Sequence, residues 1–413
     1  MKNNIIEKSL SSLLENKNFE FANFSHPLLS NGYSKKDIIE GCKVMLSKKI
    51  TMGSKTSKFE KYFAKKLKVK YALMVNSGSS ANLLSFFCLI NFLKKNMVKK
   101  NSECIIPALC WSTTLWPIIQ SGLKPVFADV DLDTFCISYK SLLKKINKKT
   151  KVIIIVNVLG NCPDIFKIRA LAKKKNIYLI EDNCESLGSK IRSKYLGTIG
   201  DFGTFSFYYS HQVTGGEGGM ITCKSKEDYQ ILKSLRAHGW DREFFKKKVK
   251  DFNFINQGFN LRPLDVSAAI AFNQFKRLDK MIKIRSKNRN LIIKTLKSST
   301  NWNNQFSFFQ PKKKLKPSWF GFPIIINNSK IYDKKKYLEF LNKKKIETRP
   351  IISGNFANQS SVKLYRIKFK KNEFTNAQKI EDDGFFIGLP TTPLKIKDVK
   401  KLSNLLLSIE LFK

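Results

Sequence analysis

The sequence predicts an α/β fold in which a large domain, built on a mostly parallel sheet with helices on both faces, precedes a smaller α+β domain. The first observation is length, because 413 residues with 42% hydrophobic content can bury two cores. The second is an alternation of short β-branched runs with amphipathic segments between about residues 70 and 220. The third is that several of these runs end in glycine or polar residues, as strands do where ligands bind.

The first elements lead to a small-residue turn. Amphipathic helices are predicted at 34–46 and 59–67, and a buried strand at 71–75. The turn 76–82 joins this strand to an apolar helix that extends to about Phe92. A strand, turn and helix in this order direct free N–H groups and a positive dipole end to one point, which suits a phosphate. An ordinary N-capped turn is the alternative.

The alternation then continues along the chain. Strands are predicted at 103–106, 125–130, 151–157 and 177–180, and helices at 111–120 and 165–175. The carboxyl ends of parallel strands meet at one edge of a sheet. We therefore expect the turn at Gly78 to converge there with Trp111, Asp182 and His211, which all lie near strand ends.

The stretch 205–220 joins an aromatic, strand-like run to a glycine-dense turn, with His211 at the junction. Glycines allow positive φ and close approach to a ligand, and histidine moves protons near neutral pH. The chain has three histidines, so the position of this one is informative. A hairpin with an incidental histidine is the alternative interpretation.

The remaining segments define the predicted division into domains. Helices are predicted at 229–237, 265–296, 332–345 and 398–411, and a strand at 321–326. We place the large domain at 1–278, with an N-terminal helical segment, and the small domain at 279–413.

Composition excludes several classes of protein. The net charge is +44, but only ten basic residues are arginine and the lysines are scattered, so we expect an anionic small substrate and no nucleic acid. Residues 1–7 lack a signal-peptide core and the apolar runs are too short to span a bilayer, so we expect no membrane partner. Eight dispersed cysteines without a Cys-x-x-Cys pair fit a reducing cytoplasm and offer no metal site.

Six ordered blocks resemble the sugar aminotransferase family of fold-type I pyridoxal 5′-phosphate (PLP) enzymes, which act on nucleotide-linked keto-sugars. The blocks are 76–82, 107–114, 181–188, 200–219, 258–262 and 347–356, and the resemblance extends from about Gly53 to Gly388. It implies PLP or pyridoxamine 5′-phosphate (PMP) as the cofactor of the large domain. It also implies that Asp182 faces the pyridine nitrogen, whereas a strand-end cap is the alternative.

The resemblance assigns the other cofactor contacts residue by residue. Gly78, Ser79 and Ser80 should hold the phosphate with backbone and hydroxyl donors, together with Ser206. Trp111 should stack on the cofactor ring, although a core tryptophan is the alternative.

Two residues of the block 258–262 are expected to act across a subunit boundary. Asn260 and Arg262 resemble residues that reach the site from a second subunit, which implies a homodimer with shared sites. We assign Arg262 to the substrate, and a surface ion pair is its alternative.

One position departs from the aminotransferase pattern. Aminotransferases of this family carry lysine where this chain has His211, and that lysine binds the cofactor covalently and moves a proton. Imidazole cannot form that bond, although it can act as a base. His211 therefore resembles the sugar 3-dehydratase branch, which makes 3,6-dideoxyhexoses for surface polysaccharide. Glu185, expected in the cofactor site, stands where many aminotransferases have glutamine and supports this branch.

Two further residues are candidates for substrate contact. Arg349 is assigned to the substrate diphosphate or to the carboxylate of the amino donor, and a domain-interface ion pair is its alternative. His238 is expected at the edge of the site or, alternatively, as a structural residue at a helix end.

The resemblance favours one sub-branch. CDP-hexulose 3-dehydrases hold an iron–sulfur cluster, but residues 237–257 contain no cysteine. The sub-branch that acts on GDP-4-keto-6-deoxymannose needs no external electrons and regenerates PMP from L-glutamate. A sugar-nucleotide aminotransferase without its lysine remains the rival enzyme class.

Overall fold

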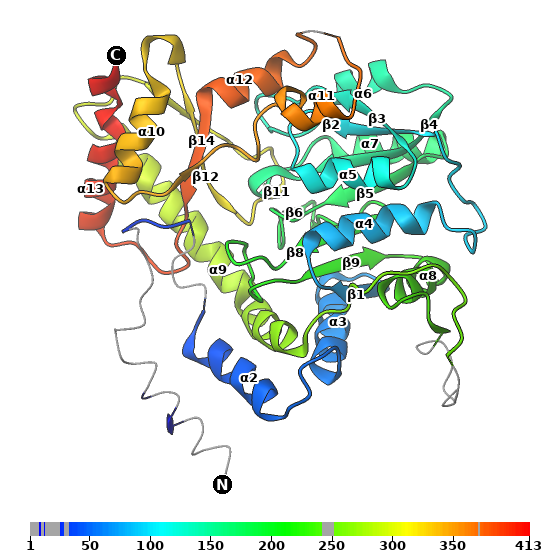
Figure 1. Cartoon of the computed structure of the whole chain (residues 1–413). Coiled ribbons are helices and arrows are strands. Elements are labelled where there is room, and N and C mark those ends of the chain that lie inside the picture. Colours follow the sequence, from blue (N-terminus) through cyan, green and yellow to red (C-terminus); the bar gives the residue numbers. More distant parts are fainter. Residues whose placement is uncertain (1–7, 10–11, 13–24, 29–32, 242–251, 371) are drawn as a thin grey trace.

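A seven-stranded sheet forms the centre of the larger part of the molecule (Figure 1). The computed structural model describes residues 8–9, 12, 25–28, 33–241, 252–370 and 372–413. The strand order is β1-β9-β8-β5-β4-β2-β3. The strands are β1 (Tyr71–Val75), β2 (Glu103–Pro107), β3 (Lys124–Ala128), β4 (Thr150–Val156), β5 (Tyr178–Asp182), β8 (Phe202–Ser206) and β9 (Gly219–Cys223).

The sheet is mostly parallel, as predicted. Strands β3, β2, β4, β5 and β8 pair in parallel, and β9 runs antiparallel between β8 and β1. The five parallel strands and β1 therefore end at the same edge. The turns that follow these strands are the ones whose polar residues the sequence singled out.

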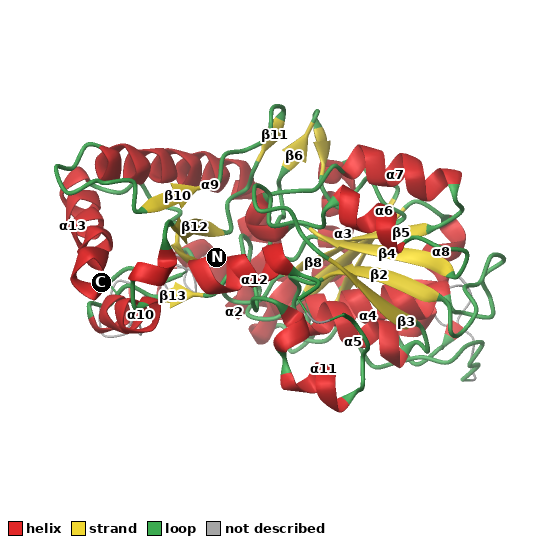
Figure 2. Cartoon of the chain, turned by 90° about the horizontal axis from the view of Figure 1, so that it is seen from above, coloured by secondary structure: helices red, strands yellow, loops and turns green. Residues whose placement is uncertain are grey.

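Helices cover both faces of the sheet. Figure 2 shows α6 and α7 on one face and α4 and α5 on the other. The helices are α2 (Lys35–Leu46), α3 (Ser54–Leu67), α4 (Gly78–Leu89), α5 (Ser112–Gln120), α6 (Tyr139–Lys145), α7 (Ile165–Lys174) and α8 (Lys226–Arg236). Because the strands are apolar and covered on both sides, nearly every residue of β4 and β5 is buried.

A cluster of phenylalanines fixes the strand that leads to His211. Phe205 on β8 lies edge-on to Phe63 of α3, with 5.1 Å between ring centroids. Phe63 in turn stacks on Phe275 of α9 (Asp265–Lys297) at 4.8 Å. These rings are buried, so burial and ring geometry both resist movement of the end of β8.

The second part of the chain is built on an antiparallel sheet in the order β10-β12-β14-β13. Its strands are β10 (Phe306–Phe308), β12 (Gly321–Ile326), β13 (Thr348–Arg349) and β14 (Gly384–Gly388). Its helices are α10 (Lys334–Lys343), α11 (Ser360–Leu364), α12 (Thr375–Asp383) and α13 (Ile396–Leu407). The 33-residue α9 (Asp265–Lys297) runs from the large sheet to this one, so the predicted boundary at 278 and 279 falls inside a helix and stays a prediction.

Several elements differ from the sequence-based expectation. The aromatic, strand-like run at the start of the stretch 205–220 belongs to a strand only as far as Ser206, because β8 begins earlier and ends there. The helix after β1 ends at Leu89 instead of Phe92. Neither α6 nor the small sheet β11-β6-β7 (Leu315–Lys316, Lys190–Ile191, Lys194–Tyr195) was predicted. The strands of this sheet have two residues each and are too short to show a period.

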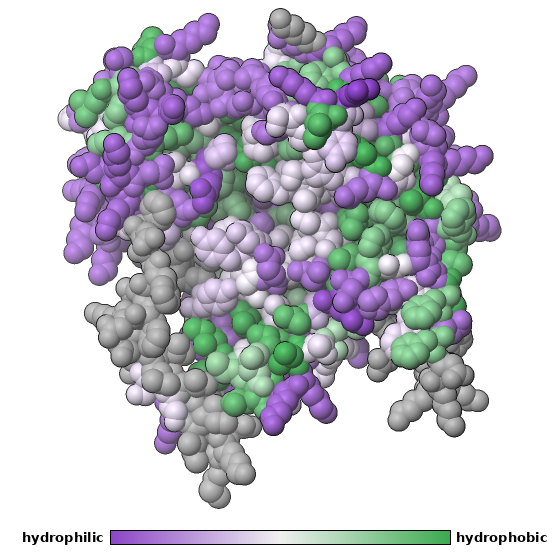
Figure 3. Space-filling view, viewed as in Figure 1, coloured by the Kyte–Doolittle hydropathy of each residue, from purple (hydrophilic) through white to green (hydrophobic). Residues whose placement is uncertain are grey.

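The surface reflects the lysine-rich composition. In Figure 3, hydrophilic side chains project along most of the outline of the visible face. Among the described residues, no helix is long and apolar enough to cross a bilayer.

Candidate active site

A cavity of about 620 Å³ opens at the carboxyl edge of the large sheet. It is lined by eight of the residues predicted from the sequence: Gly78, Ser79, Trp111, Asp182, Glu185, Ser206, His211 and Arg349. The first seven follow or end strands of the large sheet, whereas Arg349 comes from β13 of the second sheet. The structure thus brings together polar strand ends that are far apart in sequence, as expected for a ligand site in such a sheet.

The N-terminus of α4 forms one corner of the cavity. Ser77 caps this helix, because its Oγ accepts the N–H of Ser80 at 3.0 Å and donates to the Ser80 hydroxyl at 2.9 Å. The Ser80 side chain is therefore used in the cap and does not line the cavity. The Ser79 hydroxyl donates to Thr113 Oγ1 at 3.0 Å. The helix offers free N–H groups and a positive dipole end to an anion in this corner.

Gly78 is required by close packing in the same corner. A Cβ atom at this position would lie 2.6 Å from Ser206 Cβ and 2.9 Å from Cys184 Sγ. Both distances are far below van der Waals contact, so α4 can approach the end of β8 this closely only with glycine. The close approach places the free N–H groups of α4 beside Ser206, and this cradle has the donors that a phosphate group needs.

Asp182 lies at the base of the cavity, at the end of β5. Its Oδ2 accepts hydrogen bonds from Asn82 Nδ2 at 2.8 Å and Thr114 Oγ1 at 2.9 Å, and its Oδ1 accepts the Cys184 N–H at 3.2 Å. Only 4% of Asp182 is exposed. A carboxylate has about four acceptor positions, so one remains for a donor in the cavity. A protonated pyridine nitrogen is such a donor, and the arrangement therefore fits the ring of PLP.

Trp111 and Glu185 both line the cavity. Trp111 begins α5 and is 56% exposed, so it is not the core tryptophan of the alternative interpretation. Glu185 Oε2 accepts the Leu159 N–H at 2.9 Å. Burial raises the pKa of Glu185 to about 7; the Leu159 hydrogen bond opposes this rise and the charge of Asp182 adds to it.

Two backbone hydrogen bonds close the loop that carries His211. The His211 N–H donates to Tyr208 O at 3.0 Å, and the Gly215 N–H donates to Phe207 O at 2.9 Å. Val213 is fully buried and anchors the loop in the phenylalanine cluster. The loop returns to β9 through Gly218, whose φ of +150° favours glycine.

The imidazole ring of His211 packs in the cavity wall. Its centroid lies 5.0 Å from that of Phe320 and 5.9 Å from that of Tyr208, in edge-on geometry. Nδ1 is buried and has no hydrogen-bond partner among the described residues, so Nε2 is the nitrogen that reaches the cavity. Burial, with a smaller effect of the Arg285 charge, lowers the pKa of His211 to about 3, so the ring is neutral at physiological pH.

Arg349 stands at the mouth of the cavity. Its Nη2 donates to Glu347 Oε1 at 2.8 Å, and the side chain is 57% exposed. Glu347 is itself buried and also accepts the Leu28 N–H at 2.9 Å. The ion pair orients the guanidinium but leaves most of its donors free for an anionic group of a ligand.

Besides Ser80, three predicted residues do not line the cavity of a single chain. His238 is exposed, has φ of +63°, and donates its N–H to Phe259 O at 2.8 Å. Asn260 is exposed and pairs with Ala237, while Arg262 is partly exposed. The intervening Leu261 accepts the Asn76 N–H at 3.1 Å, which places this segment beside the end of β1. Its assignment to the site of a second subunit stays a prediction.

Sequence reasoning missed several residues of the site. Asn82 and Thr114, which orient Asp182, fall within the blocks 76–82 and 107–114 but gave no signal of their own. Asn82 Oδ1 also accepts from Thr204 Oγ1 at 2.7 Å, so it links α4 to β8. Phe320 and Cys184 line the cavity as well. A clue that was not used is the amide of Asn82 between the apolar residues Ala81 and Leu83 of α4.

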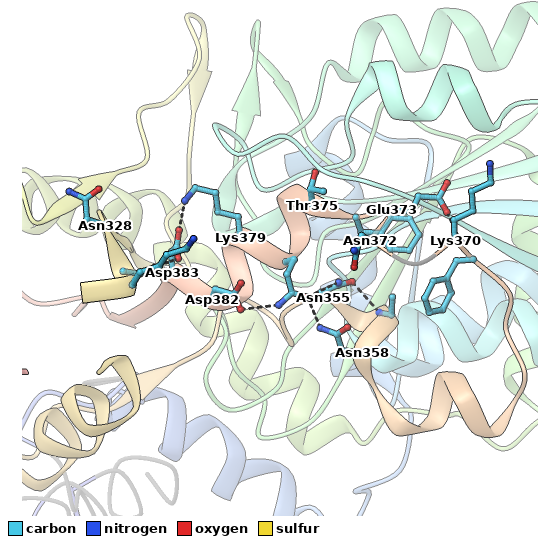
Figure 4. Close-up of a pocket in the computed structure, with 16 residues that line it drawn as sticks. Asn328, Asn355, Asn358, Lys370, Asn372, Glu373, Thr375, Lys379, Asp382 and Asp383 are labelled. Carbon is cyan, nitrogen blue, oxygen red and sulfur yellow. Dashed lines mark hydrogen bonds and ion pairs between the residues drawn. The ribbon is translucent and has the colours of Figure 1, made fainter. Parts of the chain in front are cut away.

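A second hollow, of about 770 Å³, lies against α12 and contains none of the predicted site residues (Figure 4). Its polar side chains largely satisfy one another. Gln378 Oε1 accepts from Asn355 at 3.2 Å and Asn358 at 2.8 Å, and Lys379 pairs with Asp383 at 2.6 Å. The carboxyl-edge cavity is therefore the better candidate for an active site.

The fold and the cavity define a PLP-dependent enzyme of the aminotransferase type. A model of the DegT/DnrJ/EryC1/StrS aminotransferase family matches residues 33–404, and the chain belongs to this family.

Individual relatives point to one activity. The GDP-4-keto-6-deoxy-D-mannose 3-dehydratase of Escherichia coli O55:H7 is 38% identical over 375 residues, which cover 88% of this chain and 95% of the relative. A solved structure of the E. coli enzyme of this name with bound hydrated PLP has a TM-score of 0.85 and 37% identity, and the match covers 93% of this chain and 99% of that one. Another structure of this dehydratase, with a trapped PLP-glutamate geminal diamine, has a TM-score of 0.84 and 37% identity over 92% of this chain and all of that one.

Proposed function

We propose that this protein is a PLP/PMP-dependent 3-dehydratase that acts on a nucleotide-linked 4-keto-6-deoxyhexose, GDP-4-keto-6-deoxymannose, in the synthesis of 3,6-dideoxyhexoses for surface polysaccharide. The observation that carries the proposal is His211, which occupies the cavity where aminotransferases of the family have lysine. The 38% identical dehydratase, matched along nearly its whole length, supports the same activity.

Different residues of the cavity would hold the cofactor and exclude water from it. When bound, the cofactor supplies an electron sink and, in its amine form, the amino group that condenses with the sugar ketone. The N-terminus of α4 and Ser206 would hold the phosphate, and Asp182 would keep the ring nitrogen protonated. Trp111, which lines the cavity just before α5, would stack on the ring and limit access of solvent.

His211 directs the reaction toward dehydration. It has no primary amine and cannot retain the cofactor covalently, and its flanking residues Ser210 and Gln212 offer no substitute. Its neutral imidazole can accept a proton at Nε2 and then return it to the hydroxyl at C3, which leaves as water. The amine form of the cofactor would supply the electron pair, and hydrolysis would release its amino nitrogen as ammonia, so that the sugar loses the oxygen at C3.

The remaining assignments concern the partners. L-glutamate regenerates the amine form of the cofactor, and a PLP-glutamate complex of a relative supports it as the amino donor. Arg349 binds the substrate diphosphate or the donor carboxylate at the cavity mouth. Asn260 and Arg262 contribute from a second subunit, which makes the enzyme a homodimer, and His238 contributes from the rim. The dispersed cysteines favour a cytoplasmic location.

A direct assay tests this function. Purified protein is incubated with PMP, L-glutamate and GDP-4-keto-6-deoxymannose, and the products are followed by mass spectrometry. We expect a 3-deoxy sugar and 2-oxoglutarate. A sugar that carries nitrogen at C4 would instead identify an aminotransferase, and turnover of only the CDP-linked sugar would favour the other dehydratase sub-branch.

Substituting the base provides the matched test. His211→Lys should bind PLP covalently, detectable as added mass after borohydride reduction, and should lose dehydration. His211→Asn should lose dehydration without covalent PLP. Unchanged dehydration in either variant would contradict the role of His211.

A further inference from the structure

The N-terminal segment 25–28 reaches the active-site cavity, although none of the six blocks that resemble the family includes it. The segment lies beside the residues that precede β13: the His26 N–H donates to Lys345 O, and the Glu347 N–H donates to His26 O, both at 3.0 Å. Leu28, the last residue of the segment, is 6% exposed and lines the cavity. The segment is thus held on the second sheet and ends in the site.

Two further contacts hold the segment against the end of β14. His26 Nε2 lies 2.9 Å from Gly388 O, and since a carbonyl oxygen only accepts, this ring nitrogen donates. A Cβ atom at Gly388 would lie 2.1 Å from Pro27 O and 2.8 Å from Leu28 Cα. The segment can therefore lie this close to β14 only because position 388 has no side chain.

One carboxylate joins the segment to the arginine at the cavity mouth. Glu347 Oε2 accepts the Leu28 N–H at 2.9 Å, and its Oε1 accepts from Arg349 Nη2 at 2.8 Å. Glu347 is only 5% exposed, so water competes little with either hydrogen bond. The two hydrogen bonds fix the position of Leu28 relative to the guanidinium group.

Leu28 belongs to an apolar wall of the cavity that begins beside His211. The ring of Phe320 lies 5.0 Å from that of His211 and 5.8 Å from that of Phe386. Gly388 follows Phe386 by two residues on β14, so Leu28, which lies against Gly388, is on the same face of the strand as the Phe386 ring. Phe320, Phe386 and Leu28 all line the cavity and are at most 7% exposed.

The two sides of the cavity suit different ligand groups. The cavity residues at the carboxyl edge of the large sheet are mostly polar and are assigned to the cofactor, which leaves the apolar wall for the substrate. Arg349 is paired with Phe386 across β13 and β14, so the site for an oxyanion adjoins this wall. A nucleotide-linked 4-keto-6-deoxyhexose has a diphosphate and one apolar group, the methyl carbon C6.

The wall should distinguish a methyl group from a hydroxymethyl group. Leucine and phenylalanine side chains offer no hydrogen-bond partner, so a hydroxyl at C6 would be buried against them without one. A methyl group in the same place would gain from removal of its surface from water.

We propose that Leu28 is a specificity-determining residue for the sugar. With Phe320 and Phe386 it forms the subsite for the C6 methyl group, and it selects a 6-deoxyhexose over the corresponding 6-hydroxy sugar. Glu347 and Gly388 hold it in this position. The inference rests on the proposed function for the class of substrate.

Two ligands that differ only at C6 test the inference: GDP-linked 6-deoxymannose and GDP-linked mannose. Neither has the 4-keto group that condenses with the cofactor, so both bind reversibly to the PMP-loaded enzyme, and isothermal titration calorimetry gives their dissociation constants. The wild type should bind the 6-deoxy sugar about 10- to 100-fold more tightly. Leu28→Ala should reduce this ratio by about threefold or more, whereas Leu28→Met, which conserves volume, should keep it.

A second variant and a matched control separate the subsite from general stability. Gly388→Ala displaces the segment without changing a residue that lines the cavity, and it should lower the ratio as Leu28→Ala does. Leu402 on α13 is 5% exposed and does not line the cavity. Leu402→Ala should therefore destabilise the protein but keep the wild-type ratio.

Several outcomes would overturn the proposal. These are equal affinities of the wild type for the two sugars, no measurable binding of either sugar, a wild-type ratio in Leu28→Ala, or the same loss of ratio in Leu402→Ala. The affinity for PMP should be unchanged in Leu28→Ala, because the residues assigned to the cofactor are intact. Since neither ligand is turned over, a failure of the proposed dehydration would appear separately, as absence of product in the assay with the 4-keto sugar.

Discussion

Replacing Glu185 by glutamine should make the free energy of unfolding less dependent on pH, because Glu185 has a raised pKa in the folded protein. Burial is the main cause that raises the pKa of Glu185 from 4.5 to about 7. The unfolded chain loses this proton near pH 4.5, whereas the folded chain retains it until about pH 7. The folded form is therefore favoured at low pH, and this contribution is lost as the pH rises from 4.5 to 7. One pH unit is worth 1.36 kcal/mol, so the loss is up to about 3 kcal/mol.

Urea unfolding at pH 5 and pH 8, without added cofactor, measures this effect. Glu185→Gln keeps an oxygen that can accept the Leu159 N–H and has no proton to lose, so its free energy of unfolding should fall less between the two pH values than that of the wild type. The difference should approach about 3 kcal/mol. Glu339→Gln, on the exposed side of α10, is the control and should behave as the wild type. Equal pH dependence in Glu185→Gln and the wild type would refute the reasoning.

Two further substitutions test the phosphate corner and a buried ion pair. Gly78→Ala places a Cβ 2.6 Å from Ser206 Cβ, so α4 must shift away from the phosphate position. The affinity for PLP, measured by absorbance titration, should fall about 10- to 100-fold. An unchanged affinity would contradict the assignment of this corner to the phosphate. Lys94→Met leaves the Asp228 carboxylate buried without its cation and should cost about 3–5 kcal/mol in urea unfolding. The exposed Lys167→Met should cost less than about 1 kcal/mol, and equal costs would contradict the argument.

Much of the large sheet could be predicted because its strands are short, β-branched and separated by helices. Strand β1 was placed residue for residue, and β4 within one residue. The antiparallel direction of β9 could not be predicted. Gly219–Cys223 is buried throughout, so it carries no alternation of polar and apolar residues, and its direction depends on pairing with β8 and β1.

The side chains of the site could likewise be predicted from the sequence only in part. His211 and Asp182 were singled out because polar residues at strand ends of a parallel sheet converge. Their partners could not be found in this way, since Asn82 and Asp182 are 100 residues apart and Phe320 comes from the second part of the chain. Contacts of this kind depend on how the two parts pack, which local patterns do not encode.

The arginines of this lysine-rich chain differ in what they bind: some hold other groups of the protein, whereas Arg349 has donors left for a ligand. Arginine offers several donors in a rigid fork, and lysine does not. Arg169 and Arg277 use the fork on one carboxylate each, and Arg285 uses it on two carbonyl groups. Arg349, by contrast, lines the cavity with an exposed guanidinium group, and one of its donors is used in the hydrogen bond to Glu347. The free donors of this fork support the proposed role of Arg349 in binding the substrate diphosphate or the carboxylate of the amino donor.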